Sequence, residues 1–236
     1  MTSLYMGFPN PCFIDGSDDV DAAVASLRAS FPDLRIKHVI YDASCSLSVL
    51  DFCSMVGQKL GPVLLLRPIQ SKVLEGIRLK LAANVPVASE TASTEEELHY
   101  AVSMIVGHFE NGEPLVAIDV VVGLLIMAKL DNEHMWAGNA KGYMWAADIP
   151  KGRGVDEKYK DRVPHVLNIL SQHNVLVKKP SQGKSKFALN PEQKIAIYEV
   201  LRNRKFGTVV EGYLLRNHQT ESVRVLDSLP GYDDAR

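Results

Sequence analysis

The chain has 236 residues, a net charge of −2, 46% hydrophobic residues and 23% charged residues. These values are those of an ordinary globular protein, and they exclude a fibrous, low-complexity or largely disordered chain. The length suits two domains of ordinary size. No basic stretch followed by an apolar run opens the chain, and Asp119 and Lys129 interrupt the apolar segment 115–130. We therefore expect a cytoplasmic protein that makes no membrane contact.

The cysteines and histidines do not form a pattern that would hold a metal. Cys12, Cys45 and Cys53 are odd in number and contain no CxxC pair, which argues against a disulfide framework and a zinc site. We expect reduced, mostly buried thiols. The seven histidines show no ligand spacing. No metal and no cofactor are therefore expected.

Residues 18–110 carry the pattern of an α/β domain. Short apolar runs alternate with amphipathic segments of helical length, which is typical of a small parallel sheet with covering helices. The run Val63–Leu66 is apolar without alternation, as a strand buried on both faces should be. A further strand is possible around Phe13 and Ile14. The expected strands fall within 36–43, 62–69 and 85–89, and the expected helices within 18–31, 48–61, 71–84 and 94–110.

A Gly112-Glu113-Pro114 break separates this Rossmann-like part, residues 1–111, from a second domain over 112–206. Residues 207–236 are expected to form a C-terminal tail that is loose from 217 onward. Within the second domain we expect helices over 115–130, 139–147, 156–173 and 191–204, a turn at 149–154, and a hairpin over 175–189 that turns at 180–183. Pro164 either kinks the third of these helices or marks its start.

Charge is segregated between the two parts of the chain. Between Lys151 and Lys205 there are 13 Lys and Arg against 5 Asp and Glu, a net of +8, which leaves −10 for the rest. Such a local basic surface is typical of binding to a polyanion. The predicted DNA-binding residues are Lys158, Lys160, Arg162 and Asn168 on the helix before the hairpin, and Lys178, Lys179, Lys184 and Lys186 on the hairpin. The alternative is a hairpin that uses charge to protect its edges from aggregation.

The segments YKDRVPHVLNILSQHNVLVKK and SKFALNP resemble the recognition helix and wing of winged helix-turn-helix proteins. The resemblance covers less than half of the chain. It implies a winged-helix domain whose recognition helix enters the major groove of duplex DNA while its hairpin follows the phosphates. It also allows a protein-interaction module, because winged helices serve both purposes.

Residues 21–106 resemble the receiver domain of bacterial response regulators. HVIYD would end on the phosphoacceptor, Asp42, and PVLLLR and VPVASETASTEEELHYAV would supply the fourth and fifth strands. Arg67 stands where the family has a hydroxyl, Ser89 or Glu90 stands near its lysine position, and too few residues precede Asp42 for the usual first strand and helix. The resemblance therefore implies a truncated or degenerate receiver used for dimerisation or partner binding.

Three functions remain open on the sequence. The first is a sequence-specific DNA-binding regulator, acting in transcription as a homodimer on double-stranded DNA. The second is an adaptor in which both domains bind protein. The third is a nucleotide-handling enzyme with its ligand site at the strand ends. Its candidate residues are Asp42, Ser44, Arg67 and Glu90. No GxGxxG, GxxxxGK[ST], GxSxG or HExxH motif supports an enzyme, and no catalytic residue is assigned.

Overall fold

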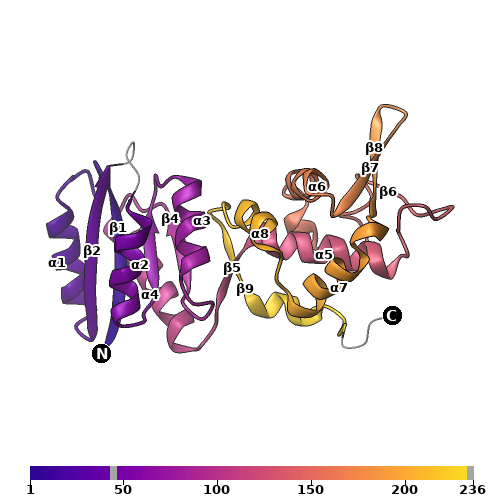
Figure 1. The fold of residues 1–236 in the computed structure, drawn as a ribbon. Helices are drawn as coiled ribbons and strands as arrows, with labels where there is room; N and C mark the ends of the chain where they lie inside the picture. The colour runs from indigo at the N-terminus through magenta and orange to yellow at the C-terminus, as the bar shows by residue number, and fades with distance from the viewer. Residues whose placement is uncertain (43–46, 233–236) are drawn as a thin grey trace. The chain divides into compact units, whose positions relative to one another are not determined.

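The computed structural model describes residues 1–42 and 47–232 and divides into two compact units (Figure 1). The first unit is Met1–Ala117 with Leu215–Val223, and the second is Ile118–Leu214 with Arg224–Arg236. The chain thus passes between the units three times. Within the described ranges, no helix is long and apolar enough to cross a membrane.

The first unit is built on a parallel sheet, as the alternation of elements predicts. Its strands are paired in the order β2-β1-β3-β4. β3 is buried along its whole length, because it has a neighbouring strand on each side and helices on both faces. The bounds of the strands are β1 Thr2–Asn10, β2 Leu34–Asp42, β3 Val63–Leu66 and β4 Val87–Glu90.

Helices cover both faces of this sheet (Figure 1). One face packs on α1 (Val20–Ser30) and α4 (Glu95–Glu110), through side chains such as Leu27 and Leu98. The other face packs on α2 (Val49–Gln58) and α3 (Ser71–Lys80). The sheet is therefore doubly wound, and its carboxyl edge is where such sheets place ligands.

The first strand and helix of this unit correct the sequence interpretation. Residues before Asp42 do suffice for both, since β1 and α1 precede β2. The strand expected near Phe13 and Ile14 is only an isolated bridge between Ile14 and Ser17. The segments expected as the fourth and fifth receiver strands are the third and fourth strands of the chain, and Asp42 ends an edge strand.

The C-terminal residues do not form the expected loose tail. They contain α8 (Thr208–Leu214), β9 (Thr220–Ser222) and a 3-10 helix, η3 (Val223–Ser228). β9 pairs antiparallel with β5 (Leu115–Ala117) in the first unit. The polar composition of this segment gave no sign of these elements, although buried Leu214 and Leu226 anchor α8 and η3 in the second unit.

The second unit packs helices against a small antiparallel sheet. α5 (Ile118–Asn132) is buried nearly all round, and α6 (Val163–Gln172) and α8 pack on it. The sheet has the order β6-β8-β7, with strands β6 Met144–Trp145, β7 Leu176–Ser181 and β8 Lys184–Leu189. α7 (Lys194–Asn203) follows after a short 3-10 helix, η2 (Pro191–Gln193), which the Asn190 side chain caps.

Three expectations for this unit need correction. No helix forms over 139–147, because tight turns at Gly138 and Gly142 precede β6, and a side chain at Gly142 would collide with the Trp136 carbonyl. The helix expected over 156–173 begins only at Val163, after a 3-10 helix, η1 (Glu157–Tyr159). The helix expected over 115–130 begins at Ile118, after β5.

The hairpin itself is confirmed, with a tighter turn than expected. Pro180 and Ser181 belong to β7, and Gln182 and Gly183 alone make the turn, with φ of 48° and 72°. Two consecutive left-handed residues match the right-handed twist of the flanking strands, which explains why a glycine follows Gln182.

Candidate nucleic-acid interface and strand-end cluster

The hairpin presents its predicted lysines on the surface, and we call β7 and β8 with these four residues the lysine hairpin. Lys178, Lys179 and Lys184 are exposed, and Lys186 is half-buried. Lys179 lies opposite Lys186 in the strand pairing, so both project from one face of the sheet, while Lys178 lies opposite the buried Phe187. Exposed ammonium groups on a two-residue hairpin are available to a phosphate backbone.

Aromatic rings lie under two of these lysines. The Nζ atom of Lys186 is 4.0 Å from the ring centroid of Trp145, and that of Lys179 is 5.4 Å from the ring centroid of Tyr143. Contacts of this kind hold the ammonium groups in place. Sequence reasoning missed both rings because it placed them in a helix, although their alternation with Met144 fits a strand with one outward face.

The exposed face of α6 agrees with the expectation for Asn168. His165, Asn168 and Gln172 are exposed at helical spacing, whereas Val166 and Leu170 are buried toward α5. His165 was missed, although it lies one turn before Asn168 on the same face. A cavity of about 760 Å³ lies beside this helix and is lined by the start of α6, the residues after β6 and the turn of the lysine hairpin.

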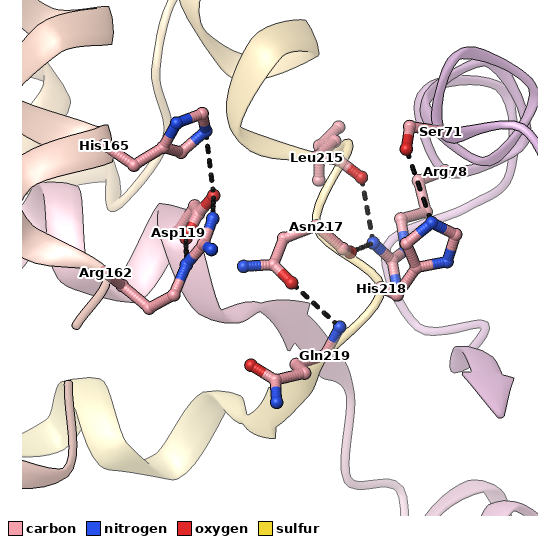
Figure 2. A network of polar contacts seen from close by, with 9 residues as sticks. All are labelled: Ser71, Arg78, Asp119, Arg162, His165, Leu215, Asn217, His218 and Gln219. Carbon is pink, nitrogen blue, oxygen red and sulfur yellow. Dashed lines mark hydrogen bonds and ion pairs between the residues drawn. The ribbon is translucent and has the colours of Figure 1, made fainter. Parts of the chain in front are cut away.

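The three cationic residues before α6 differ from the expectation. Lys158 and Lys160 lie in or next to η1 and not in the helix, and the Nζ atom of Lys160 is 3.6 Å from a carboxylate oxygen of Glu157. Arg162 donates two hydrogen bonds to Asp119, of 2.8 and 2.7 Å (Figure 2). These bonds raise the pKa of Arg162. Because Asp119 is buried, Arg162 holds α6 against α5 and is occupied within the protein.

In the first unit, two of the four candidate strand-end residues come together. Arg67 follows β3, Glu90 ends β4, and the Arg67 amide donates to the Glu90 carbonyl at 2.8 Å. Asp42 is exposed at the end of edge strand β2 and is separated from β3 by β1. Ser44 lies outside the described residues.

Four polar residues that sequence reasoning missed gather beside Arg67 and Glu90. His218 lies between two serine hydroxyls, with Nε2 3.3 Å from Ser71 Oγ and Nδ1 3.0 Å from Ser89 Oγ. Arg78 donates to the carbonyl oxygens of Leu215 and Asn217 (Figure 2) and to that of Val87. We call the following set the strand-end cluster: Arg67, Ser71, Arg78, Ser89, Glu90 and His218.

Burial and mutual repulsion shift the titration of this cluster. Burial, and after it the nearby Arg67, lower the pKa of Arg78 to about 10. The pKa of His218 is lowered by burial and by the same two arginines. The pKa of Glu90 is raised, because burial outweighs the attraction of Arg67 and Arg78. The cluster therefore holds more positive than negative charge.

Glu90 also borders a cavity of about 430 Å³ lined by α4 and the β5–β9 pair. Its lining combines Tyr100 and Met104 with carboxylates, and no Lys or Arg lines it. Across the described ranges, no group of three or more His, Cys, Asp or Glu could hold a metal ion. Cys12 is buried and Cys53 half-buried, both as free thiols, whereas Cys45 lies outside the described residues.

Comparisons of the chain with protein-family models, with curated proteins and with solved structures find no match.

Proposed function

We propose that the protein is a cytoplasmic DNA-binding regulator, which uses the second unit as a winged helix on double-stranded DNA and the first unit for dimerisation or signal input. The observation that carries the proposal is the lysine hairpin, with three exposed lysines in the strands that follow α6. A helix followed by a basic hairpin is the order in which winged helices combine base contacts with phosphate contacts.

The exposed face of α6 supports the same function. Three of its exposed side chains, His165, Asn168 and Gln172, are polar and carry an imidazole and two amides, groups that form hydrogen bonds with base edges in the major groove. The pair between Arg162 and Asp119 fixes the start of this helix on the core of the unit. A helix held in this way keeps Asn168 and His165 in one orientation, which sequence-specific contacts need.

The charge distribution argues against the alternative in which the lysines only protect a sheet edge. A protective charge needs no particular direction. Here Lys179 and Lys186 share one face and each lies over an aromatic ring, so their positions are fixed. Fixed cations lose less conformational entropy on binding a phosphate backbone than free ones.

The test is a comparison of two charge-matched triple variants in a fluorescence-anisotropy titration with a random-sequence DNA duplex. One variant replaces Lys178, Lys179 and Lys184 by Gln, and the control replaces the exposed Arg28, Arg35 and Lys80 of the first unit by Gln. We expect the first to lose at least about tenfold in affinity at low salt, and to flatten the dependence of log K on log salt by about 0.9 per lysine.

Equal affinities of the two triple variants would contradict the proposal, as would a wild-type protein without duplex affinity. If the wild type binds, selection of duplexes from a random pool tests sequence specificity, and Asn168→Ala should alter the recovered motif at one position. Light scattering of the protein with and without DNA tests the dimer, since a symmetric motif requires two copies.

A further inference from the structure

The strand-end cluster contains a buried donor without an acceptor. Arg67 follows β3, and its Nη2 atom donates to the Ser89 carbonyl at 3.0 Å. Its Nε atom is buried and has no hydrogen-bond partner. Folded proteins pair nearly all buried polar atoms, so an orphaned guanidinium nitrogen indicates that an acceptor from outside the chain belongs beside it.

The neighbouring arginine has no such free capacity. Arg78 donates to three backbone carbonyls and joins α3, β4 and the segment 215–217. It contributes positive charge without being available as a direct ligand contact. The single carboxylate of the cluster, on Glu90, is outnumbered by the two guanidinium groups. A second negative charge can therefore approach Arg67 favourably.

The imidazole and the serine beside Arg67 complete a set of donors for an anion. His218 reaches the cluster from the segment 215–219, where Arg78 and an ion pair of 2.7 Å between Arg216 and Glu75 hold the chain. Ser71 is the first residue of α3, and the residue before it, Gln70, makes no side-chain cap to the helix. The amides of Val73 and Leu74 donate to the Gln70 carbonyl, so within the site the start of α3 contributes the Ser71 hydroxyl.

We propose that Arg67, Ser71 and His218 bind the phosphate group of a small phosphorylated ligand at the carboxyl edge of the parallel sheet. Arg67 supplies the free Nε donor, and the Ser71 hydroxyl donates to the anion while the contact between its oxygen and Nε2 of His218 holds it in place. Phosphate suits this set because it accepts several hydrogen bonds at once, here from a guanidinium and a hydroxyl, and its charge is attracted by the two arginines. The site is independent of the DNA interface and stands whether or not the protein binds DNA.

The test is calorimetric titration of the full-length protein with inorganic phosphate, with acetate as the comparison anion. For an ion of this size we expect a dissociation constant on the order of 1 mM. Arg67→Ala should weaken phosphate binding at least about tenfold, and Ser71→Ala a few-fold. The matched control, Arg28→Ala, removes an exposed arginine of the same unit and should leave binding unchanged.

A second measurement keeps the proposal testable if Arg67→Ala fails to fold. The proton signal of the His218 ring, assigned by its loss in His218→Asn, should shift in NMR spectra as phosphate is added to the wild type, and Ser71→Ala should displace the titration to higher phosphate concentration. Absence of both heat and shift up to about ten times the expected constant would overturn the proposal. Equal affinity for acetate, or unchanged affinity in Ser71→Ala, would also overturn it.

Discussion

The lysine hairpin and the strand-end cluster are both rich in cations, but they expose them differently. On the hairpin, Lys178, Lys179 and Lys184 are exposed. In the strand-end cluster the positive charge is on two arginines, and one of them, Arg78, donates its hydrogen bonds to three carbonyl groups of the protein. An exposed lysine costs nothing to the fold when it is replaced, whereas a buried arginine leaves its acceptors unpaired. Burial, and not charge alone, separates cations that hold the fold from cations available to a ligand.

The largest effect that this comparison predicts is on the stability of the first unit. Arg78→Met leaves three carbonyl groups without their donor, so we expect it to lower the free energy of unfolding by about 3–5 kcal/mol. Both tryptophans, Trp136 and Trp145, lie in the second unit. Urea unfolding followed by circular dichroism should show the loss, while tryptophan fluorescence should change less. If the circular dichroism transition stays where it is in the wild type, Arg78 has no such role.

A second prediction concerns the buried carboxylate of the second unit. Asp119→Ala removes the partner of Arg162 and should destabilise this unit by about 2 kcal/mol, less than a fully buried pair because the Arg162 side chain is 34% exposed and can reach water. Here tryptophan fluorescence should follow the loss. Asp161→Ala, a nearby exposed carboxylate, is the control and should change stability by less than about 0.5 kcal/mol. Similar losses of stability in Asp119→Ala and Asp161→Ala would show that the pair with Arg162 does not stabilise this unit.

A third prediction separates binding from stability within the lysine hairpin. Lys178→Gln should reduce the salt dependence of DNA binding by about 0.9 and leave the unfolding free energy within about 0.5 kcal/mol of the wild type. Lys186→Gln should also lose the contact over Trp145, worth about 0.5–1 kcal/mol at such a site. Thermal unfolding of the two variants compares them directly. Equal stability would mean that the ring does not hold Lys186.

The sequence predicts those elements of the fold that are determined within a short stretch of residues. The apolar run of β3 and the composition of the hairpin both lie within short segments, and each matches the structure. β1 was missed because LYMGFPN mixes Met, Gly and Pro among its residues and lacks β-branched side chains. Its place in the sheet comes from pairing with β2 and β3, which no local pattern encodes.

Among the candidate site residues, too, some follow from local patterns in the sequence and others are brought together only by the tertiary structure. Lys178, Lys179, Lys184 and Asn168 are exposed on the hairpin and the helix where the sequence places them. His218 lies 147 residues from Ser71 along the chain, so only the return of the segment 215–223 to the first unit brings them together. The occupation of Arg162 by Asp119 is equally non-local, since α5 and α6 are separated by a long irregular segment. Charge and spacing can nominate a cation, but its partners depend on the tertiary structure.

The smallest predicted effect is a pair of opposite pH dependences in the strand-end cluster. The pKa of His218 is lowered in the folded protein, so its contribution to stability is present above pH 6.5 and is lost as the pH falls through the folded value. The pKa of Glu90 is raised, so its contribution is present below pH 4.5 and is lost as the pH rises through the folded value. The free energy of unfolding of the first unit, measured with urea between pH 4 and 8, should fall less in acid in His218→Asn than in the wild type. In Glu90→Gln it should be higher than in the wild type near neutral pH. Parallel curves for wild type and both variants would show that these side chains are solvated as in the unfolded chain, which would remove the electrostatic basis for treating the cluster as one site.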